Sequence, residues 1–387
     1  MAGEIAAEPF RIAVADEVLA DLKTRLAHTR WPSEPEGAGW RYGANLGYMQ
    51  AFARHWLERY DWRSHEATLN RFPQYRAKIG GGRIHFICEP GSGPHPPPLL
   101  ITHGWPGSVY EFYELIEPLA HPERFGGRIE DAFTVIAPSL PGYGFSDRPD
   151  RPINPRDIAR TWHELMTRVL GHPRYVAQAG DWGSVVTSWL ALQQPQAVKA
   201  IHLNMLALRP HLDATTPPLD EAEQAWIATT KKRLAAEGGY QQIQGTKPQS
   251  LAYGLTDSPI GLAAWIVEKF HGWPGASADQ PPPFDMDRLI TNIMLYWING
   301  INAPNWMYWS VRHEGGIALP PGVRVEVPTG FAFFPHDLFP IPPARFVARA
   351  YHVVHRRDFD RGGHFAAMEN GPVLIEEMRQ FFRAFRD

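Results

Sequence analysis

The chain has 387 residues and a formal net charge of −3, and 44% of its residues are hydrophobic. This composition suits a globular protein with a sizeable core, and the charge balance gives no electrostatic support for binding nucleic acid or anionic membranes. The single cysteine, Cys88, excludes an internal disulfide and a Cys-based zinc site, and the histidines do not cluster at metal-ligand spacings. We therefore expect neither a metal nor a cofactor.

The chain shows no segment that would place it in a membrane. Its N-terminal run, Met1-Ala2-Gly3-Glu4-Ile5, lacks the basic segment and apolar stretch of a signal peptide. No stretch approaches the roughly 18 apolar residues that a bilayer-spanning helix needs. With one cysteine and no such segment, we expect a cytoplasmic protein without a membrane anchor.

Residues 1–82 show helical periodicity. Leucines recur at spacings of three and four, and an aromatic stripe follows at fourfold spacing: Tyr48, Phe52, Trp56 and Tyr60. Such a stripe can line a cofactor, but packing against the main domain is the interpretation we favour. We expect an N-terminal helical extension that packs on the core.

Strands alternate with helices over residues 83–205. Buried strands are expected at 84–87, 99–102, 133–137, 175–179 and 200–203, with helices at 109–119, 158–170 and 185–192. This alternation predicts an α/β fold in which a mostly parallel sheet has helices on both faces.

Residues 206–318 interrupt the alternation with helical segments rich in Trp and Tyr. The strand pattern returns over 319–387, at 330–334 and 351–354, before a final helix at 373–385. We therefore expect a core formed by 83–205 and 319–387, with 206–318 as a helical cap over the carboxyl ends of the strands.

A sharp turn between small residues lies at Gly180-Asp181-Trp182-Gly183-Ser184, after the strand at 175–179. Small residues on both sides of a central residue are typical of a nucleophile elbow, here with Asp181 at its apex. An aspartate is ionised at neutral pH, so it can attack an electrophilic carbon without a base and form an ester. The simpler alternative is that Asp181 only caps the helix that begins near Trp182.

Two further residues complete a possible triad in chain order. Asp337 follows the strand ending at Phe334, and His364 lies in a glycine-flanked loop before the last helix. Nucleophile, acid and histidine in this order are typical of the α/β-hydrolase fold. His364 would activate a water that hydrolyses the ester, and Asp337 would orient the imidazole.

Ester hydrolysis also requires donors for an oxyanion. The turn His103-Gly104-Trp105-Pro106-Gly107 and the elbow can supply the backbone N–H groups of Trp105 and Trp182. The same five residue types recur at His271-Gly272-Trp273-Pro274-Gly275, but there they follow a helix and lead into a Pro-rich loop. We interpret this second copy as coincidence and not as a repeat.

The leaving group decides between functions. A halide would favour indole N–H donors, whereas an epoxide oxygen needs an acid such as a tyrosine hydroxyl. The cap contains Tyr240 and Tyr308 as candidates.

Several short segments occur together in one order: His103-Gly104-Trp105-Pro106-Gly107-Ser108, Pro141-Gly142-Tyr143-Gly144-Phe145-Ser146, Gly180-Asp181-Trp182-Gly183-Ser184, Gln244-Gly245-Thr246-Lys247-Pro248, Asp257-Ser258-Pro259-Ile260-Gly261 and Arg361-Gly362-Gly363-His364-Phe365-Ala366-Ala367. With them, and with Thr29-Arg30-Trp31-Pro32 in the N-terminal region, the chain resembles the microsomal-type epoxide hydrolases over nearly its whole length. The mammalian members of that family carry an N-terminal membrane anchor, a feature we do not find in this sequence.

The resemblance implies a role for each candidate residue. Asp181 would be the nucleophile, Asp337 the acid and His364 the base that activates water, while Tyr240 and Tyr308 would polarise the epoxide oxygen. The partners would be a small apolar epoxide and water, with a vicinal diol as the product.

Two other functions remain open from the sequence. A haloalkane dehalogenase shares the aspartate nucleophile and a tryptophan after it, and a non-catalytic binding protein could use the same scaffold. The sequence does not identify the epoxide or the oligomeric state, for which a homodimer is one option.

Overall fold

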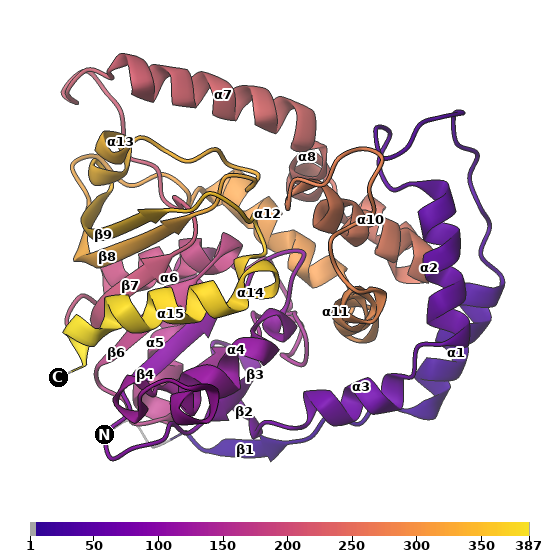
Figure 1. Ribbon diagram of the computed structural model, residues 1–387, viewed down its shortest axis with the longest axis horizontal. Helices are drawn as coiled ribbons and strands as arrows, with labels where there is room; N and C mark the ends of the chain where they lie inside the picture. Colours follow the sequence, from indigo (N-terminus) through magenta and orange to yellow (C-terminus); the bar gives the residue numbers. More distant parts are fainter. Residues whose placement is uncertain (1–4, 387) are drawn as a thin grey trace.

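The computed structural model describes residues 5–386, whose centre is a nine-stranded sheet (Figure 1). The strands lie in the order β1-β2-β3-β5-β4-β6-β7-β8-β9. Strands β4 to β9 run parallel to their neighbours in that part of the sheet, whereas β1, β2, β3 and β5 are joined by antiparallel pairings. The strands are β1 (Ala7–Phe10), β2 (Gln74–Ile79), β3 (Gly82–Glu89), β4 (Pro98–Thr102), β5 (Thr134–Pro138), β6 (Tyr175–Ala179), β7 (Val198–Leu203), β8 (Val325–Phe333) and β9 (Tyr351–Asp358). The mostly parallel sheet predicted from the sequence is confirmed.

Helices cover both faces of this sheet (Figure 1). On one face α4 packs against α15, and on the other α5 packs against α6. Strand β6 is buried at every position because helices cover both of its sides. These helices and the short turns around them are η1 (Val109–Phe112), α4 (Tyr113–Ala120), η2 (Pro122–Phe125), η3 (Ile129–Asp131), α5 (Pro155–Glu164), the π turn η4 (Leu165–Val169), α6 (Asp181–Gln193), α13 (Ala344–Ala348), α14 (Ala366–Glu369), α15 (Gly371–Phe382) and η5 (Arg383–Phe385).

The N-terminal region is only partly helical. Helices α1 (Asp16–Ala27), α2 (Leu46–Glu58) and α3 (Trp62–Leu69) form as the periodicity predicts, but β1 and β2 also lie within residues 1–82 and extend the sheet. The expectation that this region is entirely helical was wrong for β1 and β2. Strand β1 has only four residues and includes a proline, so its sequence shows no clear strand pattern. In the aromatic stripe, Phe52 and Trp56 are buried.

The segment between β7 and β8 forms the helical cap (Figure 1). Its helices are α7 (Glu221–Glu237), α8 (Gly239–Thr246), α9 (Pro248–Asp257), α10 (Pro259–Gly272), α11 (Met286–Asn299) and α12 (Asn302–Glu314). Helix α2 of the N-terminal region contacts α10 and α11, so the N-terminal helices also support the cap.

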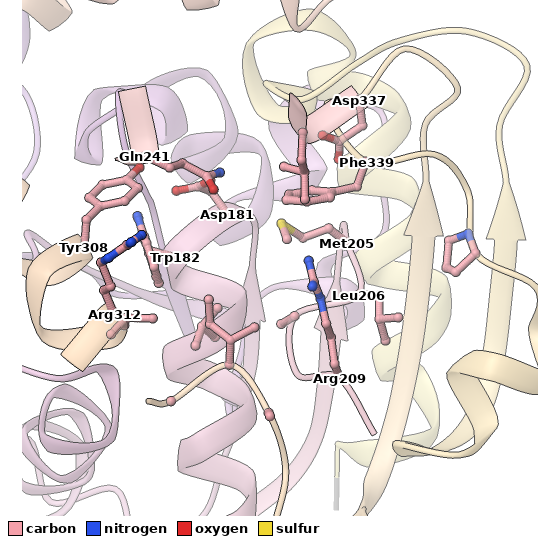
Figure 2. Close-up of a pocket in the computed structure, with 18 of the residues that line it drawn as sticks. Asp181, Trp182, Met205, Leu206, Arg209, Gln241, Tyr308, Arg312, Asp337 and Phe339 are labelled. Atoms are coloured by element: carbon pink, nitrogen blue, oxygen red, sulfur yellow. The ribbon is translucent and has the colours of Figure 1, made fainter. Parts of the chain in front are cut away.

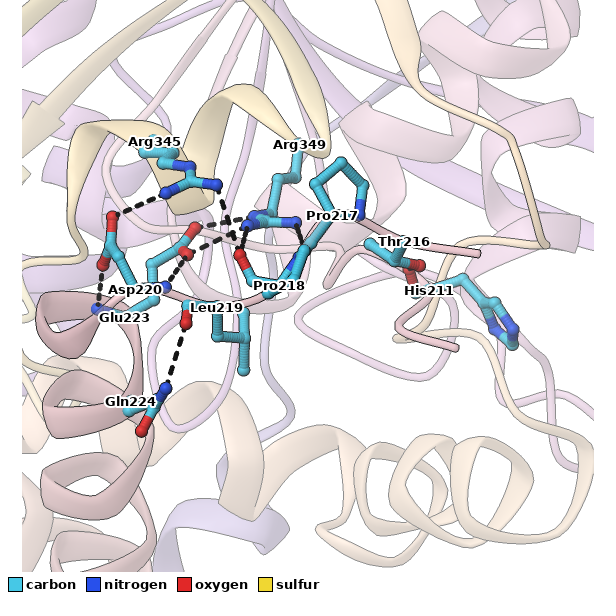
Figure 3. Close-up of polar contacts among 10 residues, drawn as sticks. All are labelled: His211, Thr216, Pro217, Pro218, Leu219, Asp220, Glu223, Gln224, Arg345 and Arg349. Atoms are coloured by element: carbon cyan, nitrogen blue, oxygen red, sulfur yellow. Dashed lines mark hydrogen bonds and ion pairs between the residues drawn. The ribbon is translucent and has the colours of Figure 1, made fainter. Parts of the chain in front are cut away.

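A cluster of ion pairs ties the start of the cap to the core (Figure 3). Asp220 and Glu223 form a capping box at the N-terminus of α7. Glu223 is fully buried and accepts two bonds from Arg349, which follows α13, at 2.6 and 3.0 Å. Arg349 also donates to the carbonyl of Pro217 at 2.8 Å, and Arg345 on α13 donates to Asp220 at 3.1 Å. These bonds fix the direction in which α7 leaves the core.

None of the helices within residues 5–386 combines the length and the apolar character that crossing a bilayer requires. The first four residues, on which part of the signal-peptide expectation rests, lie outside the described range.

Candidate active site

Asp181 lies at the turn between β6 and α6, in a strained backbone conformation. Its φ is 47°, in the left-handed region that residues other than glycine adopt uncommonly. The turn is possible because its neighbours are small: a Cβ at Gly183 would collide with the carbonyl of Thr102, and one at Gly104 would collide with the Asp181 carboxylate. This is the geometry of a nucleophile elbow.

The helix-cap alternative for Asp181 does not fit this geometry. The N-cap position of α6 is Gly180, and no side-chain bond caps the helix. Instead, Oδ1 of Asp181 accepts the backbone N–H of Trp105 at 2.8 Å. The carboxylate therefore faces the turn after β4, not its own helix.

The structure brings Asp181, His364 and Asp337 together at the carboxyl ends of the parallel strands. Nε2 of His364 lies 3.2 Å from Oδ2 of Asp181, and Nδ1 lies 2.8 Å from Oδ1 of Asp337. Asp337 follows β8, and His364 lies between β9 and α14. Both side chains are buried.

The two carboxylates control the charge of the imidazole. Burial opposes the protonated form, but the negative charges of Asp337 and Asp181 outweigh it and raise the pKa of His364 well above its ordinary value. While Asp181 is ionised, His364 is therefore held as an imidazolium.

The two expected oxyanion donors lie next to this carboxylate. Trp105 already donates its N–H to Asp181, as noted above. Trp182 follows Asp181 in the first turn of α6, where backbone N–H groups have no partner within the helix.

Tyr240 and Tyr308 come from different cap helices, α8 and α12, and their rings meet edge to face at 5.8 Å between centroids. Tyr240 stacks on the ring of Trp105 at 5.0 Å, and Tyr308 meets the ring of Trp182 edge-on at 4.8 Å. Burial, with a further contribution from the nearby Asp181 charge, raises the pKa of both phenols well above the ordinary value. Both hydroxyls are therefore protonated at neutral pH and can donate.

A cavity of about 540 Å³ lies between the cap and the core (Figure 2). Asp181, Trp182, Asp337 and both tyrosines line it. A second, much smaller cavity of about 20 Å³ lies on the other side of Asp181 and is bordered by His364, Trp105 and Asn204. This volume is enough for one water molecule beside the Asp181–His364 pair.

Glu111 on η1 also borders the small cavity and was missed by the sequence reasoning. Burial, together with the charge of Asp181, raises its pKa to about 8 against the opposing effect of His364, so the side chain is neutral at pH 7. A Cβ at Gly107 would collide with its carboxylate, so a larger residue there would require the Glu111 side chain to move. The sequence signal that could have revealed it is a carboxylic acid, Glu111, four residues after Gly107 at the end of the His103–Gly107 turn.

Two other residues that contact the His364 loop were also missed. Trp273, in the second copy of the His-Gly-Trp-Pro-Gly sequence, lies edge-on to the His364 ring at 4.7 Å and accepts the His364 N–H at its carbonyl. Glu369 accepts the N–H groups of Gly363 and Phe365, each at 2.8 Å. The second copy therefore lies against the site even though it is no structural repeat of the first.

The fold, the elbow and the contacts among Asp181, His364 and Asp337 define an α/β hydrolase. Residues 97–237 match the family model described as "alpha/beta hydrolase fold". Residues 7–112 match the model described as "Epoxide hydrolase N terminus". The chain belongs to the epoxide hydrolase family.

Individual relatives agree with this assignment. The chain is 35% identical to "Epoxide hydrolase 1" of Sus scrofa, over 96% of this chain and 88% of that protein. The crystal structure of juvenile hormone epoxide hydrolase from the silkworm Bombyx mori matches with a TM-score of 0.86 and 30% identity, over 99% of this chain and 95% of that one. The structure of Aspergillus niger epoxide hydrolase matches with a TM-score of 0.84 and 31% identity, over 98% and 97%.

Proposed function

We propose that the protein hydrolyses epoxides to vicinal diols through an ester on Asp181. Because Oδ1 of Asp181 accepts the Trp105 N–H, Oδ2 is the oxygen that attacks an epoxide carbon. The carbon–oxygen bond of the ring breaks as Tyr240 or Tyr308 donates a proton to the epoxide oxygen. The products of this step are a β-hydroxyalkyl ester and a tyrosinate, which recovers its proton from solvent.

The second step is hydrolysis of that ester. A water in the small cavity attacks the ester carbonyl carbon while Nε2 of His364 takes its proton. The N–H groups of Trp105 and Trp182 stabilise the oxyanion, a contribution commonly worth about 3–4 kcal/mol for one donor. Collapse breaks the ester carbon–oxygen bond, and the diol oxygen takes the proton back from His364. Asp181 is then a carboxylic acid, which passes its proton to the neutral imidazole and so restores the carboxylate–imidazolium pair.

Alkylation of Asp181 also changes the state of His364. The ester has no charge, so one of the two anions that raise the pKa of His364 disappears. The imidazolium then releases its proton more readily and becomes the neutral base that the second step requires. Asp337 remains bonded to Nδ1 and keeps the ring oriented.

The observation that carries the proposal is the pair of protonated tyrosines on the same cavity as Asp181. A haloalkane dehalogenase would not need phenol donors above its nucleophile. Halide release from chloroalkanes, without diol formation from styrene oxide, would replace the proposal with that alternative.

The direct test is a single turnover of excess enzyme with styrene oxide in ¹⁸O-labelled water. We expect the label in the Asp181 carboxylate and not in the diol, because water attacks the ester carbonyl. Asp181→Ala should abolish turnover, whereas the control Asp150→Ala, at an exposed position, should retain it. Label found directly in the first diol formed would refute the ester mechanism.

A further inference from the structure

The wall of the large cavity carries more positive charge than the proposed chemistry uses. Arg156, Arg209 and Arg312 line it, while the only carboxylates on the described part of the wall are Asp181 and Asp337. Both carboxylates already bond His364. The arginines therefore find no free anionic partner on the cavity wall.

Two of these arginines are engaged by other groups. The guanidinium of Arg156 lies over the ring of Trp189, 4.7 Å from its centroid. Arg312 donates to the side-chain oxygen of Gln242 at 2.9 Å. Their side chains are thus held by neighbouring protein groups.

Arg209 is different. Within residues 5–386, its guanidinium has no hydrogen bond, ion pair or aromatic ring as a partner. Figure 2 shows this group directed into the cavity on the side of Met205. The side chain stays accessible to solvent, yet the surrounding protein desolvates it and lowers its pKa.

The backbone of Arg209 is fixed, so its side chain starts from a defined place. Its N–H donates to the carbonyl of Ile317 at 2.8 Å, and its carbonyl accepts the N–H of Leu319 at 2.9 Å. These bonds join the segment after β7 to the segment that leaves the cap. They fix the point from which the side chain extends, while the guanidinium keeps its hydrogen-bond donors for an anion.

The cavity surface near Arg209 is apolar. Met205, Leu206, Ile317 and Phe339 line it together with Arg209. A ligand that fills this part of the cavity would combine an apolar segment with one negatively charged group. Guanidinium and carboxylate groups match in geometry and can form two parallel hydrogen bonds.

We infer that Arg209 is a specificity-determining residue that selects epoxides carrying a carboxylate at the end of an apolar chain. The inference rests on the proposed epoxide hydrolysis and replaces the expectation of a purely apolar substrate. The epoxide lies at Asp181 and the tyrosines, and the carboxylate lies at Arg209. Arg209 takes no part in ring opening or ester hydrolysis.

The kinetic test compares terminal epoxy carboxylic acids of increasing chain length with their methyl esters. For the wild type, we expect kcat/KM to favour the acid at one chain length. Arg209→Met should lower kcat/KM for that acid by about 10- to 100-fold, the value of a charge-assisted bond, and change that for the ester by less than about 3-fold. Arg209→Lys should recover part of the loss, since it restores charge without the bidentate fork.

A matched control separates the local contact from net charge. Arg128 lies on the surface and pairs with Glu130 at 3.4 Å, so Arg128→Met removes the same charge away from the cavity. We expect it to leave the acid-to-ester ratio unchanged. An equal loss for acid and ester in Arg209→Met, or no preference for any acid in the wild type, would overturn the inference.

A binding measurement is independent of turnover. Decanoate and methyl decanoate are titrated by calorimetry into the Asp181→Asn variant and into Asp181→Asn/Arg209→Met. Tighter binding of decanoate that is lost with Arg209 supports the carboxylate site, and equal affinity in both variants refutes it. If no epoxide of either series is hydrolysed, the proposed function fails, while the titration still decides whether Arg209 binds a carboxylate.

Discussion

Replacing His364 with glutamine should separate the two chemical steps. The first step needs only the Asp181 carboxylate and a tyrosine proton, whereas the second needs Nε2 of His364, which lies 3.2 Å from Oδ2 of Asp181. A glutamine amide can still donate to Asp337, so the buried carboxylate keeps a partner and the loop should keep its fold. The variant should therefore open the epoxide and stop at the ester.

The size of the effect follows from the role of the base. General-base catalysis contributes roughly 10²- to 10⁴-fold, or about 3–5 kcal/mol of activation free energy. Steady-state diol formation should fall by that factor, while the burst of styrene oxide consumption should remain close to one equivalent of enzyme.

Intact-protein mass spectrometry provides the assay. After mixing with styrene oxide, His364→Gln should gain the mass of one epoxide molecule, and peptide mapping should locate it on Asp181. The double variant Asp181→Asn/His364→Gln should gain nothing. A folded His364→Gln protein that neither forms the adduct nor consumes epoxide would refute the separation, because ring opening would then also require the histidine.

The remaining predictions concern the cap tyrosines, the acid beside the small cavity and the cap anchor. Tyr308→Phe or Tyr240→Phe should each slow ring opening by roughly 10²-fold, and the double variant should lose more, as measured by single-turnover epoxide consumption. Glu111 is neutral below its pKa of about 8 and ionised above it. The ionised carboxylate adds a negative charge near His364 and favours the imidazolium, which cannot act as the base, so kcat should fall as pH rises through that value. In a profile of kcat measured from pH 6 to 10, Glu111→Gln should not show this fall at high pH. A fall that persists in Glu111→Gln would show that ionisation of Glu111 does not cause it. Arg349→Met should lower the free energy of unfolding in urea by about 3–5 kcal/mol, because Glu223 remains buried without its partner. Adding Glu223→Gln should restore part of that stability, and a cap that is not anchored by this pair would show no such recovery.

The sequence pattern alone predicted those elements whose residues are neighbours along the chain. The strand, turn and helix around Asp181 follow from a buried apolar run, small residues and a second apolar run. Asp337 and His364 could be assigned because loops after parallel strands all open at one edge of the sheet.

The contacts that sequence reasoning missed are those made between distant segments. Trp273 follows a cap helix, and only the folding of the cap over the core brings it to the His364 ring. Arg209 is one of many arginines in the sequence, and its lack of a partner is a property of the cavity. Strand β2 forms on the edge that β3 offers, and β1 then pairs with β2, although neither short sequence requires a strand by itself.

The hydrogen bonds that hold Arg209 have a consequence for how this protein could be rebuilt. The cap leaves after β7 and returns to β8, strands that are neighbours in the sheet. At residues 209 and 317–319, backbone hydrogen bonds join the two ends of the cap directly to each other. Another helical module could therefore be spliced in at this seam without stretching the core. Such a chimera would keep Asp181 and His364, which belong to the core, and would replace Tyr240 and Tyr308 together with the cap side of the cavity. The group that attacks the substrate and the groups that protonate the leaving oxygen could then be varied independently.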